Sequence, residues 1–462
     1  MNLNSMFEPE SVAVIGASNK EGKVGNAIMK SMKRKYKGDV YPINLNESKV
    51  LGLDAYESVT KVEGNIDLAM IAIPAEFVPQ AVRECGEKGI ENVIIVTAGF
   101  REAGRVELEE EVVEIAKEHG VRFIGPNCLG IYNSKNDLDT IFNPPERQAR
   151  PKKGSVAFLS QSGAFGAAML DWFSESDIGI SKFVSYGNRA GLDEADFIEY
   201  LNEDEETDVI TYYIEGLKDG RKFMKAAEKC SKPIVALKSG RTSAGSNAAA
   251  SHTASLAGND EVYDAAFDQS GILRVKTVRE MVVVLRTLTT QPPAKGNKIA
   301  IVTNGGGVGV MCADSLAWND LELTDFTKKT CDRFKKAVEE GIIPDHSSLN
   351  NPIDIVGDAP SERYEAAMEI VLEDENVDAL IVAFLFQSPA IEEDIVSKTA
   401  GMKKYGKPIV AIAPGGEYTH KMGKKIEDQG IPVYETPEEG VEAIRGVVEF
   451  GDISISKNGT CE

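Results

Sequence analysis

Short apolar runs alternate with longer amphipathic segments throughout the chain. The runs are VAVI, VYPI, DLAMIAI, NVIIV and RFI, then VAFL, KFV, DVITYYI, PIVALK and ILRV, and finally IAIV, ALIVAFL, PIVAIA and PVY. Nearly continuous apolar strands are typical of parallel sheets that are covered on both faces. Because the segments between them have helical periodicity, the pattern predicts an α/β protein with doubly wound parallel sheets.

Three stretches open in the same way and predict three domains. They are "SVAVIGAS" (11–18), "GSVAFLSQSGAFG" (154–166) and "NKIAIVTNGGGVG" (297–309), each an apolar run followed by a turn of small residues. The Pro-rich basic linkers "NPPERQARPKKG" and "TTQPPAKGNK" precede the second and the third. Such composition shifts mark boundaries, so we expect domains at 1–145, 146–292 and 293–462.

The second and third predicted domains resemble copies of each other. Besides their openings, "KPIVALKSG" (232–240) matches "KPIVAIAPG" (407–415), and "DVITYYIEG" (208–216) resembles "DALIVAFLF" (378–386). Glu215 falls opposite Leu385, and the stretch "AASHTASLAG" (249–258) around His252 has no counterpart. These differences favour a catalytic role for the second domain and indicate that the third domain is a degenerate copy of it.

Composition narrows the class of function. The net charge of −22 makes a nucleic-acid or anionic-membrane binder a poor candidate, because attraction to phosphate needs basic patches. No apolar stretch is long enough to span a bilayer, and the N-terminus lacks a leader pattern. The six cysteines form no CxxC pair, so neither a metal cluster nor a disulfide framework is expected, and a cytoplasmic location is the default.

The turn after the first strand, "GASNKEGKVG" (16–25), departs from the known phosphate loops. Val24 stands where a Walker A loop has Ser or Thr, and Ser18 replaces the second glycine of GxGxxG. The second strand ends at Asn44 and Asn46, where a dinucleotide site prefers an acid. The loop therefore fits a nucleotide-like ligand other than NAD, or a tight turn alone.

A second group of candidate site residues lies at one edge of the middle sheet. "SQSGAFG" (160–166) opens a helix whose N-terminus suits a phosphate, although taken singly the motif is more often an ordinary N-cap. Glu215 follows the third strand. His252, one of four histidines, comes shortly after the fourth strand. A carboxylate that holds one ring nitrogen leaves the other as a nucleophile, so the convergence favours a phosphohistidine over a structural loop histidine.

Across its whole length the chain resembles the α subunit of ADP-forming acetate–CoA ligase, a nucleoside-diphosphate-forming acyl-CoA synthetase. The first two domains also resemble the α subunit of succinyl-CoA ligase. The matching motifs are "VAVIGAS", "VTAGFREAG" (96–104), "GPNCLGIYN" (125–133), "SQSGAFG", "YIEG", "SHTASLAG" and "NPIDIVGDA" (351–359).

The resemblance implies a Rossmann-like CoA-binding domain followed by two flavodoxin-like domains. It implies that His252 is phosphorylated and that Glu215 holds it. The phosphate-binding helix start would be Ser160, Gln161, Ser162 and Gly163, and Asn127 would line the acyl and phosphate pocket. The candidates for contacts with CoA are Gly16, Ser18, Lys23, Asn44, Pro74 and Gly99.

The implied reaction converts acyl-CoA, phosphate and ADP into a carboxylic acid, CoA and ATP through an acyl phosphate. Mg²⁺ would accompany ADP or ATP, mainly on a partner subunit. The chain ends at Glu462 without room for an ATP-grasp domain, so an ATP-grasp β subunit in an α2β2 assembly is expected. Acetate is the family's usual acid, and branched or aryl acids fit equally well.

Three rival interpretations make different demands on the sequence. A CoA-binding regulatory module without turnover needs neither His252 nor Glu215. An NAD-dependent enzyme is disfavoured by Asn44 and Asn46. A succinate-specific α subunit would lack the third domain.

Overall fold

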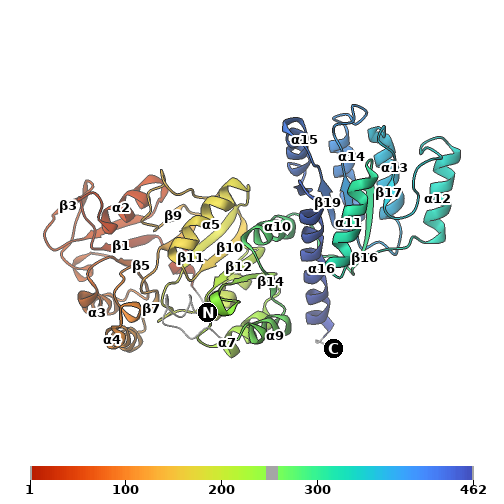
Figure 1. The fold of residues 1–462 in the computed structure, drawn as a ribbon. Coiled ribbons are helices and arrows are strands. Elements are labelled where there is room, and N and C mark those ends of the chain that lie inside the picture. Colours follow the sequence, from red (N-terminus) through yellow and green to blue (C-terminus); the bar gives the residue numbers. More distant parts are fainter. Residues whose placement is uncertain (1–2, 246–258, 460–462) are drawn as a thin grey trace. The chain divides into compact units, whose positions relative to one another are not determined.

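The computed structural model describes residues 3–245 and 259–459, and the chain forms two compact units, Met1–Lys276 and Thr277–Glu462. Figure 1 shows that each unit is built of sheets flanked by helices. No helix among the described residues has the length and apolarity needed to cross a membrane.

The first sheet of unit 1 is fully parallel, with strand order β2-β1-β5-β6-β7. Alternate β1 residues enter two different cores, Val12 and Val14 on one face and Ala13 and Ile15 on the other. Helix α2 lies on one face and α3 and α4 on the other (Figure 1), as the sequence pattern predicts. The elements are α1 (Asn4–Phe7), β1 (Ser11–Ile15), α2 (Val24–Lys35), β2 (Asp39–Ile43), the hairpin β3 (Lys49–Val50) and β4 (Leu53–Asp54), η1 (Val59–Lys61), β5 (Leu68–Ile71), η2 (Ala75–Phe77), α3 (Val78–Lys88), β6 (Asn92–Ile95), η3 (Arg101–Ala103), α4 (Val106–Glu118) and β7 (Arg122–Ile124).

The second sheet of unit 1 contains all five strands predicted for the middle domain. Its order is β14-β13-β12-β10-β11-β8-β9, and β8 runs antiparallel to β11. The elements are β8 (Gly130–Asn133), β9 (Leu138–Asp139), β10 (Lys153–Ser160), α5 (Gly163–Glu175), β11 (Ile180–Ser185), α6 (Glu194–Asn202), β12 (Val209–Ile214), α7 (Gly220–Lys229), β13 (Ile234–Lys238), α9 (Asp260–Ser270) and β14 (Leu273–Val275).

Strands β8 and β9 precede the predicted boundary at residue 145 but extend the second sheet. Both are short and carry polar residues, so they give no apolar run in the sequence. Their register is set by pairing of Gly130 with Ser185, and Thr140 Oγ1 accepts a 2.7 Å hydrogen bond from the Ile131 N–H. The first chain segment therefore contributes two strands to its neighbour's sheet.

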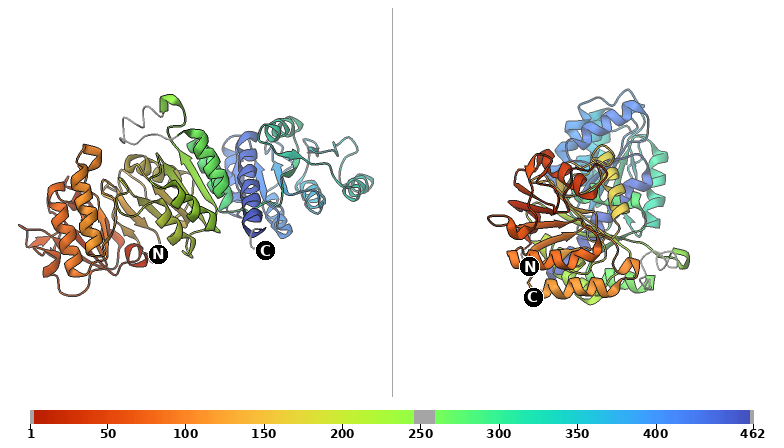
Figure 2. Two further views of the ribbon diagram at one scale, coloured as in Figure 1. Left: turned by 90° about the horizontal axis from the view of Figure 1, so that it is seen from below. Right: turned by 90° about the vertical axis from the view of Figure 1, so that its left-hand side faces the viewer.

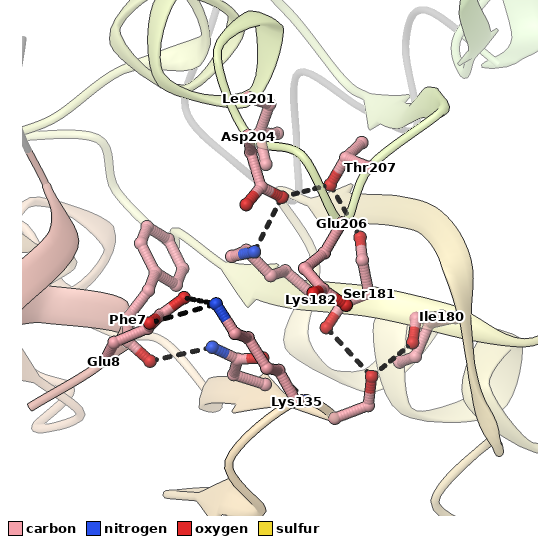
Figure 3. Close-up of polar contacts among 12 residues, drawn as sticks. Phe7, Glu8, Lys135, Ile180, Ser181, Lys182, Leu201, Asp204, Glu206 and Thr207 are labelled. Carbon is pink, nitrogen blue, oxygen red and sulfur yellow. Dashed lines mark hydrogen bonds and ion pairs between the residues drawn. The ribbon is translucent and has the colours of Figure 1, made fainter.

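A polar cluster joins β11 with the segment that follows α6 (Figure 3). Lys182 Nζ, with a fully buried side chain, lies 2.6 Å from the Asp204 carboxylate. Asp204 also accepts from Thr207 Oγ1, which contacts Ser181 Oγ at 2.7 Å. Each buried polar side chain here has a partner, as interiors require.

Unit 2 is a third doubly wound sheet, with order β16-β15-β18-β19-β20 and β17 paired with β15. Helices α10, α11 and α16 cover one face, where α10 lies beside α16 (Figure 2, left), and α12–α15 cover the other. The elements are α10 (Val278–Leu288), β15 (Lys298–Thr303), α11 (Gly306–Trp318), β16 (Glu322–Leu323), α12 (Lys328–Glu339), β17 (Ile353–Asp354), α13 (Ser361–Leu372), β18 (Ala379–Ala383), α14 (Ile395–Gly401), η4 (Met402–Tyr405), β19 (Ile409–Ile412), α15 (Glu417–Glu427), β20 (Val433–Tyr434) and α16 (Pro437–Gly459).

Helix α10 lies before the predicted boundary at residue 293 but packs within unit 2. The Tyr434 hydroxyl donates to the Val283 carbonyl at 2.9 Å, and Arg445 pairs with the buried Glu280. The compact unit thus begins at the start of this helix, and the Pro-rich linker that followed it in sequence is a loop inside the unit.

Replacing Asp204 with Asn should destabilise unit 1 strongly. The change leaves the Lys182 ammonium buried without a counter-charge, which costs about 3–5 kcal/mol. The urea midpoint of unit 1 is measurable by Trp172 fluorescence in a Trp318→Phe background, since these are the two tryptophans of the chain.

The matched control is Glu206→Gln, because the Glu206–Lys153 pair is partly exposed and such pairs contribute about 0–1 kcal/mol. Equal shifts for the two variants would contradict the role of the buried pair.

Candidate active site

The predicted CoA contacts lie at the carboxyl edge of the first sheet. Because its strands are parallel, the loops after them all emerge at that edge. The residues concerned are Gly16 and Ser18 after β1, Lys23 before α2, Asn44 after β2, Pro74 after β5 and Gly99 after β6.

Glycine in the first loop is required by close backbone packing. Gly16 has φ +92°, and a Cβ there would lie 2.4 Å from the Ala72 carbonyl oxygen. A Cβ on Gly25 would lie 1.9 Å from the Gly16 oxygen. The steric requirement explains these glycines without a ligand, so the CoA contact of Gly16 stays a prediction.

Polar side chains of the same loops bond to one another. Asn44 Nδ2 donates to the Ala17 carbonyl at 2.7 Å, and its Oδ1 accepts from the Asn46 N–H at 2.7 Å. The Glu47 carboxylate accepts from Ser18 Oγ at 3.3 Å. An acid therefore does follow the second strand, but it is engaged with the glycine loop.

The start of helix α5 has the geometry of an open N-terminus. Ser162 is the N-cap residue, and its Oγ accepts from the Phe165 N–H at 3.3 Å. Ser160 is fully buried, and its Oγ donates to the Ser162 carbonyl at 2.7 Å. Ser160 thus shapes the turn from inside, while the first-turn N–H groups of α5 have no intrahelical partner.

Gln161 connects the ends of β10 and β12. Its Oε1 accepts from the N–H of Glu215 at 2.6 Å and from that of Gly216 at 3.1 Å. Its own backbone N–H donates to the Tyr213 carbonyl at 3.3 Å. Glu215, which is largely buried, is therefore held by its backbone beside the start of α5.

A cavity of about 910 Å³ opens between the carboxyl edges of the two sheets of unit 1. Five predicted site residues line it, namely Asn127, Gln161, Ser162, Gly163 and Glu215; Ser160 and the six CoA candidates do not. The other lining residues are Val24, Ala72, Ile73, Val96, Thr97, Ala98, Arg101, Glu102, Cys128, Leu129, Phe142, Asn143, Ala164, Gly187, Asn188 and Arg189.

Asn127 stands on an interlocked pair of loops. It has φ +59°, and its N–H donates to the Thr97 carbonyl at 2.9 Å. Opposite it, Gly187 has φ +51°, and a Cβ there would lie 2.3 Å from the Pro126 oxygen. Because the Asn188 N–H donates to that same oxygen at 2.9 Å, both loops are tightly fixed.

Arg189, Glu102 and Asn188 are site residues that sequence reasoning missed. Arg189 pairs with the buried Glu194 at 3.1 Å. Burial raises the pKa of Glu102, but hydrogen bonds from Asn188 and from backbone N–H groups outweigh it and hold the pKa below its ordinary value. Glu102 and Asn188 are 86 residues apart, so only their glycine-flanked motifs, "GFREAG" and "YGNRAG", offered a signal.

His252 lies outside the described residues. Among the residues that are described, no group of His, Cys, Asp and Glu side chains forms a candidate metal centre.

The internal copy in unit 2 repeats the side-chain contact that Gln161 makes between two strand ends, but it has no acid in the place of Glu215. Asn304 stands where the second domain has Gln161, and its Oδ1 accepts from the Leu385 N–H at 3.0 Å. Leu385 is the residue that the sequence comparison places opposite Glu215. The two copies therefore share a backbone arrangement, and the carboxylate is specific to the second domain.

Three family matches cover most of the chain. They are a CoA binding domain over residues 10–134, a succinyl-CoA ligase like flavodoxin domain over 153–288 and a ligase-CoA domain over 299–449.

Two relatives and a solved structure match nearly the whole chain. The α subunit of ADP-forming acetate–CoA ligase II of Pyrococcus furiosus is 42% identical over 97% of this chain and 97% of its own length. The ADP-forming 4-hydroxybutyrate–CoA ligase of Nitrosopumilus maritimus is 35% identical over 98% of this chain, which spans 65% of that protein. Acetyl-coenzyme A synthetase 1 of Ca. Korarchaeum cryptofilum, solved with phosphate and ADP, is 34% identical, with a TM-score of 0.91 over 100% of this chain and 99% of that one.

Replacing Gln161 with Leu should loosen the Glu215 backbone. Two N–H groups would lose their acceptor, and each unpaired buried group costs about 1–3 kcal/mol. Hydrogen exchange at the amides of Glu215 and Gly216 should become faster, while exchange at β6 should stay unchanged. Unaltered exchange at residues 215 and 216 would mean that Gln161 does not hold them.

Proposed function

The chain belongs to the ADP-forming acetate–CoA ligase α-subunit family, and we propose that it interconverts acyl-CoA, phosphate and ADP with a carboxylic acid, CoA and ATP through a phosphohistidine at His252. The observation that carries the proposal is the cavity itself. It brings strand ends of the CoA-binding domain together with the start of α5 and Glu215.

The first chemical step forms an acyl phosphate. Phosphate bound at the first turn of α5 is stabilised by the N–H groups and the positive end of the helix dipole. One phosphate oxygen attacks the thioester carbonyl carbon, the carbon–sulfur bond breaks, and CoA leaves as the thiolate, which takes a proton. Asn127, in the cavity wall, is suited to contact the acyl and phosphoryl oxygens.

In the second step the phosphoryl group moves to His252. The ring nitrogen attacks phosphorus, the bond from phosphorus to the bridging oxygen breaks, and the carboxylate leaves. Glu215 would accept the hydrogen bond from the other ring nitrogen, which fixes the tautomer and stabilises the charge on the ring. ADP then takes the phosphoryl group, and Mg²⁺ would neutralise the nucleotide phosphates.

The nucleotide step calls for an ATP-grasp β subunit, which we propose as the partner in an α2β2 assembly. The support is that the Pyrococcus furiosus relative is itself named as a subunit α and matches this chain end to end. The Korarchaeum structure holds ADP and phosphate, the ligands that the scheme requires. As the acid we propose acetate or another small carboxylic acid, since relatives are named for acetate and for 4-hydroxybutyrate.

Mixing the chain with its β subunit and Mg·ATP should place an acid-labile, base-stable phosphate on the α chain. His252→Ala should abolish the labelling, because no nucleophile remains to accept the phosphoryl group. Filter-bound radioactivity from γ-labelled ATP, followed by acid and base treatment, measures the result.

The matched variant is Glu215→Gln, which keeps the size of the side chain and should lower the yield of phosphoenzyme without abolishing CoA binding. Full labelling of His252→Ala would overturn the mechanism. A wild-type chain that binds CoA but never incorporates phosphate would instead support a regulatory CoA-binding module.

A further inference from the structure

A line of hydrogen-bonded side chains connects helix α4 with the cavity wall. Asn188 Nδ2 donates to Glu102 Oε2 at 2.6 Å and to Glu109 Oε2 at 2.9 Å. On its other side, Asn188 Oδ1 accepts from Asn127 Nδ2 at 3.2 Å. The line ends at the residue that the proposed mechanism brings closest to the acyl group.

The two carboxylates determine the orientation of both amides. An ionised carboxylate can only accept hydrogen bonds, so the end of Asn188 that faces Glu102 and Glu109 must be its NH₂. The Asn188 oxygen then faces Asn127, so the Asn127 amide must donate to it from its own NH₂. A flip of either amide would oppose two oxygens or two NH₂ groups.

Both carboxylates are themselves firmly held. Glu102 Oε1 accepts from the N–H groups of Gly99 and Phe100, and Arg101 Nε donates to Glu109 Oε1 at 2.8 Å. The Glu109 side chain is only 4% exposed. The hydrogen bonds from Asn188 and the backbone also hold the pKa of Glu102 below its ordinary value against the opposing effect of burial, so it stays ionised at neutral pH.

We propose that Glu102, Glu109 and Asn188 are positioning residues, which orient Asn127 so that an N–H of its amide faces the acyl oxygen. One Nδ2 hydrogen of Asn127 is taken by Asn188, and the second remains for a ligand. The carbonyl oxygen of a thioester accepts hydrogen bonds and gains negative charge as phosphate adds to the carbon. A fixed donor at that oxygen stabilises the charge, whereas a flipped amide would present an oxygen and repel it.

The inference rests on the proposed function, and a double-mutant cycle on the complete assembly tests it. Glu102→Gln is nearly isosteric. With its oxygen on the Gly99 and Phe100 N–H groups, the new amide turns an NH₂ toward the Asn188 NH₂, so Glu109 alone is left to hold the orientation of Asn188. We expect kcat for CoA-thioester formation to fall about 10- to 100-fold, less than the loss of about 100- to 1000-fold seen when an oxyanion donor is removed outright, with little change in KM for CoA. Phosphorylation of the chain from ATP in the absence of CoA should not change.

The matched control is Glu111→Gln, an exposed residue of helix α4, which should behave as wild type. In an Asn127→Ala background, Glu102→Gln should have no further effect, because its influence passes through the missing amide.

Two results would overturn the inference and leave the proposed function standing. One is a Glu102→Gln rate equal to that of Glu111→Gln, and the other is an undiminished effect of Glu102→Gln in the Asn127→Ala background. The second result would place Glu102 in direct action or in general stability. A wild-type assembly that makes no thioester from any acid would overturn the proposed function and the inference together.

Discussion

One side-chain oxygen, Gln161 Oε1, holds two backbone N–H groups and thereby joins the ends of β10 and β12. Parallel strands bring their carboxyl ends to one edge, but they do not fix the loops that follow. The Gln161 contact does so for the loop that carries Glu215. Asn304 makes the equivalent contact in unit 2, where the loop carries Leu385. The contact that joins the strand ends is therefore common to both domains. In the second domain the loop that it holds carries an acid.

The second constraint is electrostatic, because the chain is acidic and the substrates that we propose for it, phosphate and CoA among them, are anions. Two carboxylates near the cavity are engaged by donors: Glu102 by backbone N–H groups and Asn188, and Glu109 by Arg101 and Asn188. Arg189 is likewise paired with Glu194. In the proposed mechanism the attraction for phosphate falls mainly to backbone N–H groups at the start of α5, which need no free cation.

The sequence predicted the strands and much of the site because both follow from local patterns. Apolar runs identified every long strand, and Gln161 and Glu215, which the carboxyl-edge rule brings together, line one cavity. Asn127, expected there from the family resemblance, lines it as well. Strands β8 and β9 were missed because their residues, GIYN and LD, include polar side chains and form no apolar run. The line of hydrogen-bonded side chains through Asn188 was missed because its members lie far apart in sequence. Their contacts depend on how two loops interlock. Ser160 is buried under the turn and shapes it, and its predicted part in binding phosphate stays a prediction.

The central claim is that phosphate oxygen enters the acid through an acyl phosphate whose phosphorus is then attacked. The most direct measurement supplies the complete assembly with acyl-CoA, ADP and fully ¹⁸O-labelled phosphate and weighs the released acid by mass spectrometry. The account predicts one ¹⁸O atom in each acid molecule after a single turnover, since the bridging oxygen stays with the carboxylate. An acid without ¹⁸O would show that its new oxygen comes from water, and would contradict the account.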